Sequence, residues 1–188
     1  MAYLPSHGFD IEVVTLPHDW MEFQSRHEYE EHAQGAHQPT SRTDDLIQRI
    51  STTRYVNWIQ RAVMVPDLLA IWARSAARQM AEQLEGIDLV YGTSPPYSGM
   101  VAAQRLADLL GVPCVQELRD PPSFHRSLRR RSSFYRARMV RFERKYLSQA
   151  QRVITVRPRT RKRLLEIHPG LDPDRFDVVT NGYPDLEA

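Results

Sequence analysis

Residues 88–99 have the sequence DLVYGTSPPYSG, and this stretch decides the predicted fold. The segment 88–91 is a short apolar run typical of a buried strand. Ser94 comes next with two prolines behind it, a pattern that favours a helix N-cap followed by proline at the first helical position. We therefore predict a strand, a tight turn and a helix over 95–110 that ends at Gly111.

The same alternation continues on both sides of this stretch. Further strands are predicted for residues 11–15 (IEVVT), 113–118, 153–156 and 176–180, the last closed by a turn at Asn181-Gly182. Helical spacing is found over 46–84, in part of 125–145 and over 159–167. In the first of these, Pro66 is expected to start a second helix that Gly86 ends. Strands alternating with helices predict an α/β fold, a Rossmann-like parallel sheet with helices on both faces.

Length and composition indicate one folded domain. The chain has 188 residues, 41% hydrophobic and 26% charged, so we expect one domain over residues 1–184 with a flexible polar loop at about 18–45. No apolar run of membrane-spanning length and no signal peptide are found in the sequence, which favours a cytoplasmic protein. Cys114 is the single cysteine and can form neither an internal disulfide nor a zinc cluster.

The polar loop contains HEYEEH at residues 27–32. A zinc-binding pair on one helical face needs histidines four residues apart, and His27 and His32 are five apart. No metal site and no cofactor are therefore expected.

The net charge of +2 hides a strong asymmetry along the chain. Residues 1–45 carry two arginines against nine acidic residues, whereas residues 126–168 carry fifteen lysines or arginines against Glu143 and Glu166. Such a basic block favours phosphate-bearing partners, namely nucleic acid, anionic lipid or a sugar phosphate.

Polar side chains follow three of the predicted strands, where a parallel α/β sheet binds its ligands. They are Thr93, Ser94, Arg119, Asp120 and Arg157. The helices that begin at these points add backbone N–H donors suited to an anion. Two structural alternatives stay open: Ser94 as a helix cap, and Arg119 with Asp120 as an ion pair that fixes the turn.

The order of five motifs resembles the N-terminal domain of a retaining family 4 glycosyltransferase of the two-domain GT-B fold. The motifs are PDLLAIWARSA at 66–76, DLVYGTSPPYSG at 88–99, GVPCVQELRDPP at 111–122, ERKYLSQAQRVITV at 143–156 and FDVVTNGY at 176–183. The resemblance implies a domain that holds a sugar or lipid-linked acceptor. It also implies transfer from a nucleotide-sugar in envelope or exopolysaccharide synthesis, with retention of the anomeric configuration.

The resemblance also implies roles for single residues. Thr93, Ser94 and Tyr97 match a loop that borders the acceptor cleft, and Arg119 is expected to hold a phosphate. Asp120 is the candidate catalytic residue, expected to accept a proton or a hydrogen bond from a sugar hydroxyl. Arg157 stands where relatives have a small hydroxyl residue and is kept as a substrate-binding candidate. Trp72 and Glu143 are interpreted as packing and helix-pairing residues.

Two segments of the family pattern have no counterpart in this sequence. These are the first strand with its glycine-rich loop, expected before residues 11–15, and the donor-binding domain, expected after Asn181-Gly182. We therefore expect the chain to be half of an enzyme and inactive alone. The missing strand would leave an exposed sheet edge through which two copies could associate.

The basic stretch 126–145 interleaves arginines with aromatic residues, a pattern suited to an anionic membrane surface. The arginines assigned to that surface are Arg129, Arg130, Arg131, Arg138 and Arg141. This predicts a peripheral protein at the inner face of the membrane, although a solvated helix with one apolar face fits equally. The alternative function is a non-catalytic module that binds anionic membrane or nucleic acid through its basic face. A dinucleotide-dependent enzyme is disfavoured because no G-x-G-x-x-G follows a predicted strand.

Overall fold

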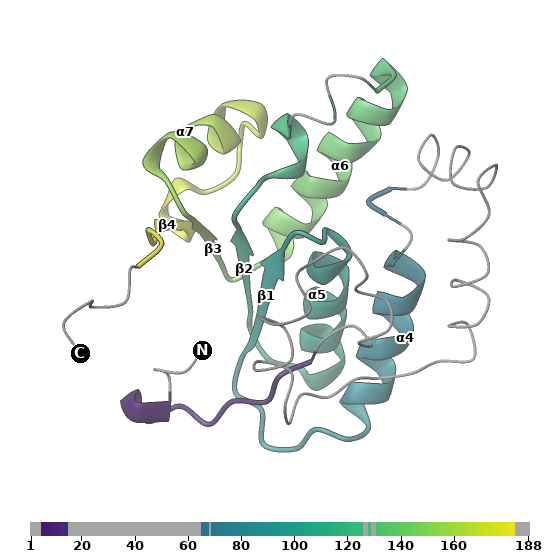
Figure 1. Cartoon of the computed structure of the whole chain (residues 1–188), viewed down its shortest axis with the longest axis vertical. Helices are drawn as coiled ribbons and strands as arrows, with labels where there is room; N and C mark the ends of the chain where they lie inside the picture. The colour runs from purple at the N-terminus through teal and green to yellow at the C-terminus, as the bar shows by residue number, and fades with distance from the viewer. Residues whose placement is uncertain (1–4, 15–64, 68, 126–127, 129–130, 183–188) are drawn as a thin grey trace.

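The computed structural model describes residues 5–14, 65–67, 69–125, 128 and 131–182, and its centre is a four-stranded parallel sheet (Figure 1). The strands lie in chain order: β1 (Val90–Ser94), β2 (Cys114–Leu118), β3 (Arg152–Thr155) and β4 (Phe176–Val178). In the register, Val90 pairs with Cys114, and Val153 pairs with both Gln116 and Phe176. The predicted α/β fold with a parallel sheet is confirmed.

Three helices connect the successive strands: α5 (Ser98–Leu110), α6 (Ser133–Gln149) and α7 (Pro158–Ile167). Helix α4 (Ala70–Ala81) precedes β1 and packs along α5. Short 3-10 turns are η1 (Pro5–His7), η3 (Pro122–Phe124) and η5 (Pro173–Arg175). Because parallel crossovers are right-handed, a sheet whose strands follow chain order has its connecting helices on one face. The prediction of helices on both faces is therefore corrected for the described residues.

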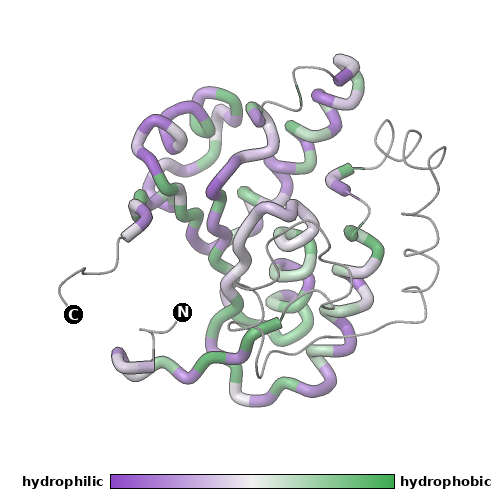
Figure 2. The backbone as a smooth tube through the Cα atoms, in the orientation of Figure 1, coloured by the Kyte–Doolittle hydropathy of each residue, from purple (hydrophilic) through white to green (hydrophobic). Residues whose placement is uncertain are grey.

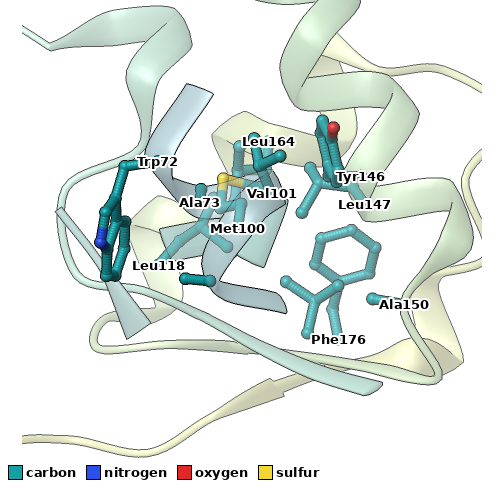
Figure 3. Close-up of a cluster of buried hydrophobic side chains, with 12 residues drawn as sticks. Trp72, Ala73, Met100, Val101, Leu118, Tyr146, Leu147, Ala150, Leu164 and Phe176 are labelled. Carbon is teal, nitrogen blue, oxygen red and sulfur yellow. The ribbon is translucent and has the colours of Figure 1, made fainter. Parts of the chain in front are cut away.

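The main core lies between that face of the sheet and the helices (Figure 3). Leu118 of β2, Val153 of β3 and Phe176 of β4 contribute to it, as expected for strands with one buried face. Its buried members are Trp72, Ala73, Ala76, Met100, Val101, Leu118, Tyr146, Leu147, Ala150, Val153, Leu164 and Phe176. The interpretation of Trp72 as a packing residue is confirmed. A second cluster beside it joins α4, α5 and β1, and Cys114 is buried there.

Two glycines allow α5 to lie close against β1. A Cβ atom on Gly92 would lie 2.5 Å from Cβ of Ala103, and one on Gly99 would lie 2.7 Å from the carbonyl oxygen of Thr93. Strand β1 continues through Gly92 to Ser94, three residues beyond its predicted end, because these residues pair with Gln116, Glu117 and Leu118 of β2. At the other end of α5, Gly111 takes φ 71° and ends the helix as predicted.

The predicted buried strand at 11–15 is wrong for the residues that the structure describes. Only Val14 forms a single bridge, and Ile11, Val13 and Val14 are half-buried. Val14 packs against the edge of the second cluster. Side-chain packing therefore buries part of this residue without a strand ladder.

Three predicted helix ends and one turn are also corrected. Helix α4 begins at Ala70, not at Pro66, because the Asp67 carboxylate accepts hydrogen bonds from the backbone N–H of Leu69 and of Ser98, both at 3.0 Å. This helix ends at Ala81, where Gln83 and Leu84 both donate to the carbonyl of Met80, so Gly86 lies beyond it in the link to β1. Ser94 is not an N-cap. It ends β1, and α5 begins only at Ser98. Asn181 and Gly182 form no turn.

The polar loop at 18–45, the HEYEEH motif and the first predicted helix lie outside the described residues. Arg129 and Arg130 lie outside them as well.

Candidate functional site

The carboxyl ends of the four parallel strands meet along one side of the sheet, which we call the carboxyl edge (Figure 1). Arg119, Asp120 and Arg157 follow β2 and β3 at this edge. The backbone N–H of Arg119 donates to the carbonyl of Ser94 at 3.1 Å, which joins the ends of β1 and β2. The predicted site residues are therefore brought to one edge, but the two ends of that edge differ.

At the β1 end, the hydroxyl group of Ser94 is used by the protein itself. Ser94 is fully buried, and its Oγ donates to the carbonyl of Glu117 at 3.2 Å. This bond links neighbouring strands, so Ser94 has a structural role and does not face a substrate. Thr93 is exposed on the opposite face of the strand. Of the two predicted hydroxyl groups, only that of Thr93 is accessible.

Tyr97 follows β1 and Asp120 follows β2, so both lie at the carboxyl edge. Burial raises the pKa of the half-buried Tyr97 above its usual value, and the negative charges of Asp120, Glu143 and Asp67 add to the rise. The phenol therefore stays protonated at neutral pH and can donate a hydrogen bond. Asp120 is exposed and offers a carboxylate that can accept one. A sugar hydroxyl, which both donates and accepts, matches this combination.

Arg119 and Asp120 form no ion pair with each other, so the alternative in which such a pair fixes the turn is wrong. The positive charge of Arg119 instead acts on Tyr91 of β1. Burial and Glu117 raise the pKa of the Tyr91 phenol, and Arg119 opposes this rise. Both side chains after β2 are exposed and available to a ligand.

A buried carboxylate and imidazole pair anchors the turn that follows Asp120. Glu143 on α6 and His168 at the end of α7 are essentially inaccessible, and Glu143 Oε2 contacts His168 Nε2. The second oxygen, Oε1, accepts the backbone N–H of Ser123 at 3.1 Å. Glu143 thus joins α6, α7 and η3, and its interpretation as a helix-pairing residue is confirmed.

At the β3 end, Arg157 lines an open hollow of about 230 Å³ with Phe124, Arg159, Thr160 and Arg163. A neighbouring hollow of about 150 Å³ is lined by Ser123, Phe124, His125, Leu128, Arg136 and Arg163. We call the two together the basic pocket. Arg157 precedes α7, so the start of that helix faces the same hollow.

The sequence analysis missed most of these residues. Only Arg157 of the basic pocket was singled out, because Arg136, Arg159 and Arg163 were counted only as part of a charged block and Ser123 and Phe124 lie more than 30 residues away in sequence. Asp67, which supports the first turn of α5, was missed too. Its only sequence signal is an acidic residue directly after a proline, which is common in turns.

Of the arginines predicted for a membrane surface, Arg138 and Arg141 lie on α6, where hydrophilic and hydrophobic residues alternate (Figure 2), and Arg131 lies two residues before it. Arg131 lies 5.4 Å from the ring centroid of Tyr135, and Arg138 lies 5.7 Å from that of Phe134. Arg141 is exposed. Phe134 is 69% exposed, which is unusual for so large an apolar side chain.

Neither a metal centre nor a membrane span is found in the part of the chain that the structure describes. No group of three or more histidine, cysteine or acidic side chains there is placed to hold a metal ion. None of the described helices has the length and apolar character needed to cross a bilayer.

Comparison with known proteins adds the family. The family profile described as glycosyl transferase 4-like domain matches residues 1–182, which is nearly the whole chain. A search of the curated proteins found no match. The match agrees with the parallel α/β sheet and with polar groups gathered at its carboxyl edge. The chain belongs to the glycosyl transferase 4-like domain family.

Proposed function

We propose that this chain is the acceptor-binding half of a retaining glycosyltransferase. Glycosyl transfer in general follows from the family, and acceptor binding is supported by one observation: the half-buried phenol of Tyr97 and the exposed carboxylate of Asp120 follow neighbouring strands at the carboxyl edge. A protonated phenol and an exposed carboxylate at one edge can receive and orient a sugar hydroxyl. The acceptor is a sugar or lipid-linked sugar used in envelope or exopolysaccharide synthesis.

In the proposed reaction, the bond between the anomeric carbon of the donor and its nucleoside diphosphate breaks. A new bond forms between that carbon and the acceptor oxygen, on the same face of the sugar ring. The acceptor hydroxyl passes its proton to the carboxylate of Asp120, and the nucleoside diphosphate leaves with the bonding electrons. Asp120 accepts a hydrogen bond from the reacting hydroxyl, Tyr97 orients a neighbouring one, and Thr93, Arg119 and Arg157 contact the remainder of the acceptor.

The donor is a nucleotide-sugar, and we propose that a second domain outside residues 1–184 binds its nucleotide. Transfer then needs both domains, and the chain alone binds acceptor without turnover. No metal or other cofactor is required in this scheme, because the diphosphate leaving group can be stabilised by positively charged groups.

The test is transfer of a labelled sugar from a panel of nucleotide-sugars to lipid-extracted and soluble acceptors. The full chain is assayed alone and together with any donor-binding domain found by translating the flanking DNA. We expect transfer only in the combined assay, with the anomeric configuration of the donor kept in the product. Asp120→Asn should lower the rate about 100-fold, as for loss of a group that assists proton transfer. The control Asp88→Asn removes an exposed carboxylate before β1 and should leave the rate unchanged.

No transfer in either format, together with saturable binding to DNA, would favour the alternative, a non-catalytic basic module. Inversion of the anomeric configuration would refute the retaining assignment alone. Analysis of the reaction product distinguishes the two outcomes, because the first gives no product and the second gives a product of inverted configuration.

We propose in addition that the protein is cytoplasmic and peripheral at the inner face of the membrane, held there by α6. The exposed ring of Phe134, with Arg138 over it and Arg141 nearby along the helix, joins an apolar anchor to positive charge. Co-sedimentation with vesicles containing anionic lipid should weaken in Phe134→Ser and not in Leu109→Ser, which removes an exposed apolar side chain from α5. Equal weakening, or no weakening, would count against this surface.

A further inference from the structure

The basic pocket lies at the carboxyl edge between η3 and α7, beside the residues assigned to the acceptor. Its two hollows share Phe124 and Arg163 in their linings, so they lie next to each other. Four of the lining side chains are arginines, and they come from two helices and the residue that precedes one of them. They are Arg136 of α6, Arg157, and Arg159 and Arg163 of α7.

None of these four guanidinium groups forms a salt bridge or a side-chain hydrogen bond with another described residue. Two other arginines of the same region are used internally. Arg161 donates to the carbonyls of Phe176 and Pro173, and Arg152 pairs with Asp177. Like charges gathered around one hollow repel each other, and an anion in the hollow would relieve that repulsion.

Neutral donors complete the lining. Ser123 Oγ is buried at the pocket and has no hydrogen-bond partner among the described residues. Thr160, in the first turn of α7, adds a second hydroxyl group. The start of α7 also faces the pocket, and its dipole favours negative charge there. Guanidinium forks, hydroxyl groups and a helix start are the groups that proteins use to bind phosphate.

The pocket is held in shape by its neighbours. The Arg163 guanidinium lies 5.1 Å from the ring centroid of Phe124, which keeps that arginine over the hollow. The backbone of Ser123 is held by the buried carboxylate of Glu143. The larger hollow, at about 230 Å³, lies below the roughly 300–1,000 Å³ of pockets that bury a drug-sized ligand. A phosphate or diphosphate group fits this size better than a whole nucleotide.

We propose that the basic pocket binds the phosphate or diphosphate group of the acceptor, so that the substrate class is a phosphorylated or diphosphate-linked sugar. This inference rests on the proposed function, because it takes the neighbouring edge as the acceptor site. The phosphate sits against Arg159, Arg163 and Arg136, and the sugar extends past Arg157 toward Asp120 and Tyr97. Arg159, Arg163, Ser123 and Thr160 become phosphate-binding residues.

The test uses the full chain with inorganic pyrophosphate and inorganic phosphate as probes, titrated by calorimetry at low salt. The variant Arg159→Gln/Arg163→Gln removes two pocket cations and leaves every residue assigned to the sugar in place. The matched control Arg78→Gln/Arg105→Gln removes two exposed cations from α4 and α5, so the net charge changes equally. Circular dichroism and thermal unfolding of both variants establish that they are folded.

We expect pyrophosphate binding to weaken at least 10-fold in the pocket variant and less than twofold in the control. Equal weakening in both variants would show a general charge effect and overturn the proposal. Unchanged binding in the pocket variant would overturn it too. A second arm uses vesicles containing anionic lipid without pyrophosphate. If vesicle binding falls in the pocket variant while pyrophosphate binding does not, the pocket is a lipid-headgroup site and the acceptor assignment fails.

A third arm separates this inference from the proposed function. In the transfer assay, a phosphorylated acceptor and its dephosphorylated form are compared. Transfer to both at equal rates leaves the glycosyltransferase standing and refutes the phosphate requirement. Absence of transfer, with pyrophosphate binding still lost in the pocket variant, refutes the proposed function and leaves an anion site without its assigned substrate.

Discussion

The two ends of the carboxyl edge differ in what their polar groups do. At the β1 end, the hydroxyl of Ser94 and the backbone N–H of Ser98 are bonded to other parts of the protein. At the β3 end, four arginines and the hydroxyl of Ser123 have no such partner among the described residues. A position at the ligand-binding edge of an α/β sheet therefore does not by itself make a residue functional. What matters is whether its polar group is already satisfied.

This comparison predicts that substitutions of residues packed or bonded within the protein, such as Ser94 and Gly99 at the β1 end and Glu143 at the anchor, change stability. Substitutions of exposed groups without such a partner, such as Thr93 and Arg163, should change ligand binding instead. Four expected effects follow, from the largest to the smallest.

The largest loss of stability is expected for Glu143→Ala, because it leaves His168 and the backbone N–H of Ser123 buried without their acceptor. Removal of one partner of a buried pair costs about 3–5 kcal/mol, although less if the imidazole is neutral. Urea unfolding measures the change. Glu166→Ala, an exposed position on α7, is the control and should change the free energy of unfolding by less than about 0.5 kcal/mol. A similar value for both variants would show that the anchor contributes nothing.

Gly99→Ala should cause the next largest loss of stability. The added Cβ would lie 2.7 Å from the Thr93 carbonyl oxygen, so α5 must move away from the end of β1. Overpacking of this kind costs about 1–3 kcal/mol, and only part of it is offset by the higher helix propensity of alanine. Thermal unfolding should show a lower midpoint. An increase in stability would mean that α5 can move freely and that the β1 end is not closed.

Ser94→Ala should lose about 1 kcal/mol, the usual contribution of one hydrogen bond. Acceptor and pyrophosphate binding should be unchanged, because the hydroxyl does not face the ligand. Thr93→Val is the companion variant. It keeps the shape of an exposed side chain, so stability should stay constant while acceptor binding weakens. The reverse pattern for the two variants would exchange the roles given to these neighbours.

The smallest effect on stability is expected for Arg163→Gln, at less than about 0.5 kcal/mol, because its charge is exposed and forms no ion pair with a described residue. At low salt the variant should be slightly more stable than the parent chain, since one of four repelling cations is removed. Added pyrophosphate should stabilise the parent chain more than the variant. A large loss of stability without ligand would show that Arg163 is a structural residue.

Much of the fold could be predicted from the sequence, because helix periodicity and short apolar runs are local signals. The strand at 114–118 and the helix that ends at Gly111 are examples. The start of α5 could not be placed, since it depends on Asp67, which lies 31 residues away and accepts the N–H of Ser98. The strand predicted for residues 11–15 was wrong for a related reason. An apolar β-branched run specifies burial, and packing at a cluster rim provides that as well as a strand does.

The candidate site was predictable only in outline. Asp120 and Arg157 stand at strand ends and are visible to a reader of the sequence. Phe124, Arg136 and Arg163 are joined to Arg157 only by the path of η3 across α6 and α7, which the anchor at Glu143 fixes. The role given to Ser94 was wrong because sequence shows a hydroxyl group at a strand end and not the carbonyl that receives its hydrogen bond.

The most direct test of the difference between the two ends is an amide NMR map of the full chain titrated with pyrophosphate. We expect amide chemical-shift changes at Ser123, Phe124 and over residues 157–163, and none at Ser94 or Ser98. Shifts of equal size at both ends, or shifts confined to the β1 end, would contradict it.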